Sequence, residues 1–102
     1  MTRRDALVTT IEALHAEIAA LKVNDVAALA AATRAKLAGI EAVAAHDHEP
    51  AGPEIRELAA EAHRLNETCR IYVNLMAANV RRRLQTLTGA AGSAYRPGMA
   101  FA

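Results

Sequence analysis

The most constraining feature of this sequence is a narrow stripe of regularly spaced apolar residues in its second half, between Pro53 and Leu87. The apolar side chains alternate at intervals of three and four residues, which places them on one face of an α-helix. The file comprises Ile55, Leu58, Ala62, Leu65, Cys69, Tyr72 and Met76, and then shifts phase to Val80, Leu84 and Leu87. A helix with such a stripe must bury it against another element or a partner.

The first half carries a similar stripe and a helix start signal. Thr2 precedes Asp5 by three residues, the spacing of a capping box. The apolar residues that follow in heptad spacing are Leu7, Ile11, Leu14, Ile18 and Leu21. The stripe then slips by one residue and resumes at Val26 and Leu29, which favours one helix over about residues 3–45, locally unwound near Asp25. Asn24 and Asp25 allow a second interpretation, in which they cap a new helix after a short break.

Turn and breaker residues divide the chain into its predicted parts. Pro50 and Gly52 predict a loop over residues 46–52, and Pro53 is well placed at the first turn of the next helix. We expect that helix to span about 53–88 and to break at Gly89. Residues 89–102 would then form a flexible C-terminal tail, whose large side chains are Tyr95, Met99 and Phe101.

Two long helices of similar length predict an all-α fold. The expected arrangement is a long antiparallel helical hairpin, coiled-coil-like, with a kink allowed in the first helix. Because two helices alone bury little surface, we expect the hairpin to form a homodimer, to fold a terminal segment over its seam, or to keep a groove for a partner helix.

Composition and charge argue against several classes of function. The net charge is +1, from 12 basic and 11 acidic residues, so no global field draws the chain to nucleic acid. No apolar stretch approaches the roughly 20 residues of a membrane span, and no secretory signal follows Met1, so we expect a soluble cytoplasmic protein. Cys69, the single cysteine, excludes an intramolecular disulfide. The scarcity of aromatic residues disfavours a small-molecule pocket, and nothing indicates a cofactor.

Several local features have a structural explanation. His46, Asp47, His48 and Glu49 are adjacent on a loop without the spacing of a zinc site, and they predict a solvated turn without metal. We interpret the run Arg81–Arg83 as cations that are attracted to the expected C-terminus of the second helix. Cys69 lies on the stripe as a small apolar residue, with no base that would make it catalytic, so we expect no enzyme activity. Ala62-His63-Arg64-Leu65 resembles the motif of histidine phosphotransfer domains, which makes a signalling module phosphorylated on His63 one alternative; a purely structural helical adaptor or dimer is the other.

The chain also resembles FlgN-type flagellar export chaperones, from Leu7 to Gly98. The residues that carry this resemblance are Glu17, Ala20, Leu21, Asp25, Leu29, Lys36 and Ile40 in the first half and Leu65, Asn66, Leu84, Leu87 and Tyr95 in the second. The resemblance implies a cytoplasmic, non-enzymatic chaperone of flagellar type III export. It would hold hook-associated proteins of the hook–filament junction and deliver them to the cytoplasmic domain of the export gate.

Such chaperones bind an amphipathic terminal segment of the client as a helix on their last long helix, which is helix-in-groove recognition. The residues that match that surface are Leu65, Asn66, Tyr72, Val73, Met76, Asn79, Val80, Leu84 and Leu87. In the family a tyrosine of the tail helps the chaperone to dock on the export gate, and the resemblance assigns that role to Tyr95.

Overall fold

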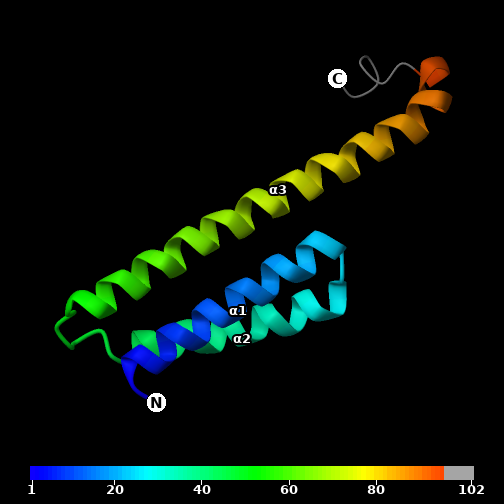
Figure 1. Cartoon of the computed structure of the whole chain (residues 1–102). Coiled ribbons are helices and arrows are strands. Elements are labelled where there is room, and N and C mark those ends of the chain that lie inside the picture. The colour runs from blue at the N-terminus through cyan, green and yellow to red at the C-terminus, as the bar shows by residue number, and fades with distance from the viewer. Residues whose placement is uncertain (96–102) are drawn as a thin grey trace. The chain divides into compact units, whose positions relative to one another are not determined.

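The computed structural model describes the backbone of residues 1–95 and the side chains of residues 1–88. It contains three helices in the order α1 (Arg3–Val23), α2 (Val26–Ala44) and α3 (Pro53–Tyr95), shown in Figure 1. No strand occurs among the described residues. The predicted all-α class is confirmed.

The predicted capping box at the start of α1 is present. The Thr2 hydroxyl accepts a hydrogen bond from the Asp5 amide at 3.0 Å, and the Asp5 carboxylate accepts one from the Thr2 amide at 3.3 Å. These two bonds satisfy amide groups that have no partner within the first turn of a helix.

The first apolar run forms two helices, so the expectation of one helix over about 3–45 is wrong. Asn24 adopts the left-handed conformation, with φ 57° and ψ 42°, and its amide reaches the carbonyl groups of Ala20 and Leu21. The Asp25 carboxylate then accepts a hydrogen bond from the Ala28 amide at 3.0 Å and caps α2. Asparagine tolerates this conformation and aspartate is a strong N-cap, so two adjacent residues end one helix and begin the next.

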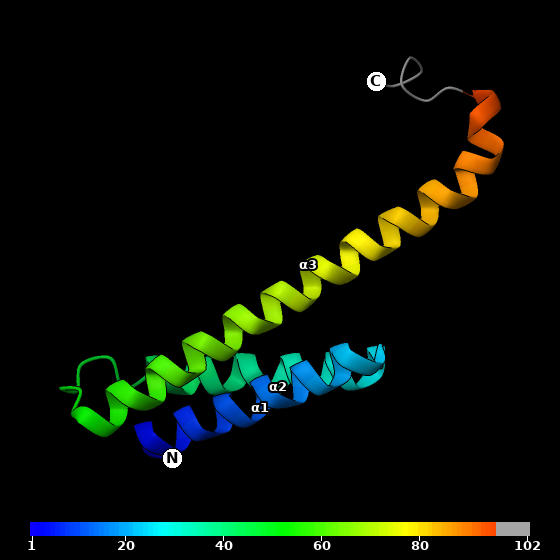
Figure 2. The same ribbon diagram turned by 45° about the horizontal axis from the view of Figure 1, so that its top comes forward.

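α1 and α2 fold back on each other as an antiparallel pair (Figures 1 and 2). One side of α1 carries small buried residues at heptad spacing, Ala6, Ala13 and Ala20. Thr10 lies on the same side, directly against Gly39 of α2. The close approach of the two helices therefore depends on small residues more than on interlocking large ones. The larger buried side chains of α1 are Leu7, Ile11, Leu14 and Leu21.

Replacing Gly39 by Ala tests this close approach. A Cβ atom at Gly39 would lie 3.2 Å from the Cα and N atoms of Thr10, and closer still to its hydroxyl oxygen. Alanine favours a helix over glycine by about 1 kcal/mol, but the two backbones must move apart, so we expect a net loss of about 1–2 kcal/mol in unfolding free energy. Gly52→Ala in the connector is a control for the same substitution without a close neighbour, because nothing lies within 4 Å of its added Cβ. Urea titration followed by far-ultraviolet circular dichroism measures the unfolding free energy of both variants. Equal losses for Gly39→Ala and Gly52→Ala would contradict the close approach of α1 and α2.

The chain divides into two units, Met1–Tyr72 and Val73–Ala102, and α3 contributes to both. Within the first unit, α3 starts beside the start of α1, where the Arg4 Nε atom lies 2.8 Å from a Glu54 carboxylate oxygen. At the other end of α1, the Lys22 ammonium lies 5.9 Å from the centre of the Tyr72 ring, a cation–π contact. α3 therefore runs parallel to α1 here. The predicted hairpin between the first and second halves is wrong, because the hairpin forms within the first half.

The connector between α2 and α3 is held in place by hydrogen bonds. The His46 Nδ1 atom lies 2.6 Å from a Glu49 carboxylate oxygen, and the Arg3 guanidinium donates to the Glu49 carbonyl oxygen at 2.7 Å. The hydrogen bond with His46 lowers the pKa of the Glu49 carboxyl group from its ordinary value. The residues predicted as a solvated turn thus form a turn that also contacts the N-terminus.

The predicted break at Gly89 is also wrong, since α3 continues to Tyr95. A single glycine costs a helix only about 1 kcal/mol relative to alanine, and Ala90 and Ala91 follow it. The part of the predicted tail from residue 96 onward, including Met99 and Phe101, lies outside the described residues.

Candidate functional site

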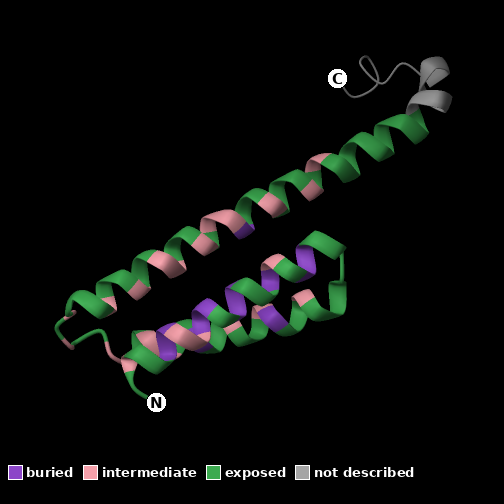
Figure 3. Ribbon diagram, viewed as in Figure 1, coloured by how far each residue is buried: buried purple, intermediate pink, exposed green. Residues whose placement is uncertain are grey.

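The later part of the α3 stripe, together with Val73 beside it, is left exposed or only half-buried in the structure. We call it the C-terminal stripe, and it consists of Val73, Met76, Val80, Leu84 and Leu87. Figure 3 shows that buried residues lie mainly on α1, whereas this part of α3 is exposed or only partly covered. The exposed fractions are 49% for Val73, 53% for Val80, 55% for Leu84 and 71% for Leu87. Such a file of exposed aliphatic side chains marks an interaction surface more often than it marks a free monomer face.

The residues predicted to bind a client fall into two groups. Leu65, Asn66 and Tyr72 belong to the first unit, where Leu65 and Tyr72 are half-buried and Asn66 is exposed. The remaining residues belong to the second unit, and they are the C-terminal stripe and Asn79. The Asn79 side-chain oxygen accepts a hydrogen bond from the Arg82 guanidinium at 3.1 Å. Tyr95 is the last residue of α3, and its side chain lies outside the described ones.

A polar cluster lies inside the first unit and was not predicted. The Glu17 carboxylate, only 5% exposed, lies 3.1 Å from the Lys36 ammonium and accepts a hydrogen bond from the Thr33 hydroxyl at 2.7 Å. Glu17 is three residues after Leu14 and four before Leu21, so its position on the apolar stripe was a signal in the sequence. A buried carboxylate at such a position needs a cationic partner, which the partly exposed Lys36 supplies.

Cys69 lies beside this cluster and is the one buried residue among the described residues of α3. Its thiol donates a weak hydrogen bond to the Leu14 carbonyl oxygen at 3.7 Å. Burial first, and then the Glu17 carboxylate, raise the pKa of the Cys69 thiol to about 11. The thiol therefore stays protonated at neutral pH, which makes it a poor nucleophile and a packing residue.

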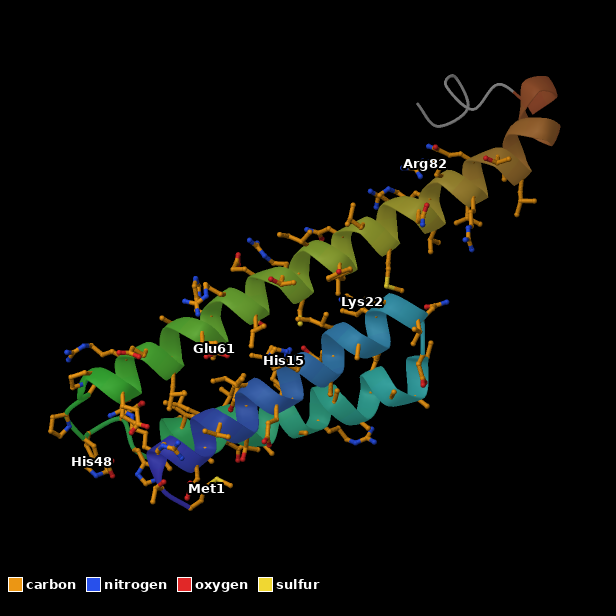
Figure 4. The ribbon with its side chains drawn as sticks, in the orientation of Figure 1. Met1, His15, Lys22, His48, Glu61 and Arg82 are labelled. Carbon is orange, nitrogen blue, oxygen red and sulfur yellow. The ribbon has the colours of Figure 1, made fainter. Side chains whose placement is uncertain are left out.

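The histidines contribute no cluster. His63 is exposed on α3, and Glu67, one turn further on, pairs with Arg70 at 2.7 Å. His15 is exposed on α1, and Figure 4 shows it apart from His48 of the connector. No group of three potential metal ligands comes together within the part of the chain that the structure describes.

None of the helices in the described part of the chain is both long enough and apolar enough to cross a membrane. Comparison with protein-family models, with curated proteins and with solved structures finds no match to this chain. Among the described residues, the C-terminal stripe is the candidate surface for function. It offers aliphatic anchors at helical spacing, which suit the binding of another helix.

Proposed function

We propose that this protein binds an amphipathic helix of another protein along the C-terminal stripe of α3. The observation that carries this proposal is the exposure of Val80, Leu84 and Leu87 on one face of a regular helix. Fully burying an aliphatic side chain of this size contributes about 1.5–3 kcal/mol. Several such anchors are enough for a specific complex after the cost of association has been met.

The stripe has the width of a helix-pairing seam. Its members follow each other at intervals of three or four residues, and the flanking positions are polar or charged, as with Asn79 and Arg83. A narrow seam of this kind suits one partner helix that interlocks with it, as in a coiled coil.

We further propose the class of client from the sequence resemblance alone. The protein would act as a non-enzymatic export chaperone of the flagellar type III system. It would mask the terminal helix of a hook–filament junction protein until delivery to the export gate, at which Tyr95 would take part in docking. Covering a client's assembly helix would prevent its premature polymerisation.

Co-expression with a hook–filament junction protein, followed by size-exclusion chromatography, tests the proposal. We expect a complex with the full-length client and no complex when the client's C-terminal helix is removed. Unchanged binding after this truncation would contradict helix capture. Binding of unrelated amphipathic helices, without binding of any junction protein, would retain helix capture and contradict the flagellar client.

A further inference from the structure

All eleven acidic residues of this chain lie in its first two thirds, whereas five of its twelve basic residues follow the last of them, although the net charge of the chain is only +1. The last acidic residue is Glu67. The basic residues that follow it are Arg70, Arg81, Arg82, Arg83 and Arg96. From this separation we infer that the partner of the C-terminal stripe is an acidic amphipathic helix, with carboxylates on both sides of its apolar seam. This inference rests on the proposed function and specifies its partner.

Arg81 and Arg83 lie on the two sides of the stripe. Arg83 is three residues after Val80 and four before Leu87, so it borders the stripe on one side. Arg81 is three residues before Leu84 and borders the other side. Both arginines are exposed. A helix that lies in the seam would bring its flanking positions next to these guanidinium groups, as at the charged positions beside a coiled-coil seam.

The attraction of cations to a helix C-terminus does not explain the positions of Arg81, Arg82 and Arg83. α3 continues to Tyr95, and its last turn contains no basic residue. The macrodipole acts mainly within the last turn, so Arg81, Arg82 and Arg83 lie too far from the helix end to be explained by it. Arg82 bonds to Asn79, and none of the three arginines pairs with a carboxylate in the described part of the chain. Arg82 is exposed on α3 and is labelled in Figure 4.

A second copy of the chain and an anionic membrane each fit the C-terminal stripe and its arginines less well than an acidic helix does. A second copy of this segment would bring arginines against arginines, because residues 68–102 contain no acidic residue. An anionic membrane would attract the arginines, but helices that lie on membranes present a broad apolar face, commonly with Trp or Phe. The C-terminal stripe is a single file without an aromatic residue, and Arg82 is on the side away from it.

Three synthetic helical peptides test the charge of the partner. They share the same Leu positions at heptad spacing and carry Glu, Gln or Lys at the positions that flank the seam. Isothermal titration with the full chain at about 0.05 M salt gives their affinities. We expect the Glu peptide to bind about tenfold more tightly than the Lys peptide, with the Gln peptide between them, and we expect the difference to shrink at high salt. The double variant Arg81→Gln/Arg83→Gln should abolish most of the preference. Arg34→Gln/Arg64→Gln removes the same charge from exposed positions elsewhere and should retain it.

The outcomes separate this inference from the proposed function. Equal binding of the three peptides would overturn the acidic partner and leave helix binding intact. A preference that survives in the Arg81→Gln/Arg83→Gln variant would overturn the role of these arginines. Failure of all three peptides would overturn both proposals, and binding to phosphatidylserine vesicles in their place would identify a membrane as the occupant.

Discussion

Replacing Glu17 by Leu should lower the free energy of unfolding by about 3 kcal/mol. The substitution leaves the Lys36 ammonium, whose side chain is 18% exposed, without its anionic partner at 3.1 Å. It also removes the oxygen that accepts the Thr33 hydrogen bond. An unpaired buried charge costs about 3–5 kcal/mol, and the partial exposure of Lys36 places the expected value at the lower end. Urea denaturation followed by circular dichroism measures the loss.

Two further variants show whether the pairing, and not the residue itself, causes the loss. Glu12→Leu is the matched control, because Glu12 is exposed on the same helix, and it should change stability by less than about 0.5 kcal/mol. The double variant Glu17→Leu/Lys36→Met removes both charges and should recover most of the stability. A Glu17→Leu variant as stable as Glu12→Leu would show that the pair does not hold α1 and α2 together.

Replacing Leu84 by Asn should weaken binding of a client helix by about 100-fold while leaving the fold unchanged. Leu84 is 55% exposed in the free protein, so little packing is lost. In the complex the substitution removes about half of the roughly 1.5–3 kcal/mol that full burial of a leucine contributes, because only the 55% that is exposed becomes covered on binding. It also buries an amide at a cost of about 1–3 kcal/mol, and the sum corresponds to this loss of affinity. Titration calorimetry measures the binding, and circular dichroism confirms that helix content is retained.

Leu75→Asn provides the control for this substitution. Leu75 is nine residues before Leu84, which places it on the opposite side of α3, and it is 61% exposed. The change in side chain is the same and the helix is the same, so the two variants differ in the face that they alter. We expect less than about a twofold effect on binding. A comparable loss from both variants would argue against a binding surface confined to the C-terminal stripe.

Local signals in the sequence predicted much of the fold. The capping box of Thr2 and Asp5 and the helix start at Pro53 follow from chemistry between near neighbours, and both are present. Asn24 and Asp25 also form a capping signal, which predicts the break between α1 and α2. The competing prediction of one helix over about residues 3–45 follows from the apolar stripe, which resumes after a slip of one residue. The structure shows that the capping signal outweighs the stripe, since a break lets α2 fold onto the small residues of α1.

What the sequence did not predict depends on contacts between distant residues. The pairing of Glu17 with Lys36 requires the turn at Asn24, so a single long helix placed the two residues far apart. The continuation of α3 through Gly89 depends on the alanines beyond it, whose favourable propensity outweighs one glycine. The expected breaker at Gly89 predicts that the run Arg81–Arg83 lies at a helix end, but α3 continues to Tyr95. The net charge of the whole chain does not show that these arginines lie beyond the last acidic residue, Glu67.

Amide hydrogen exchange with and without a bound client helix tests the central claim most directly. Exposed helices exchange through local opening, and a partner that covers them raises their protection. We predict that a junction protein's C-terminal helix, or the Glu peptide, slows exchange of the amides over residues 73–88. Unchanged exchange over that segment, with new protection at Leu37 and Ile40 of α2, which are 56% and 47% exposed, would contradict the account and move the binding surface to α2.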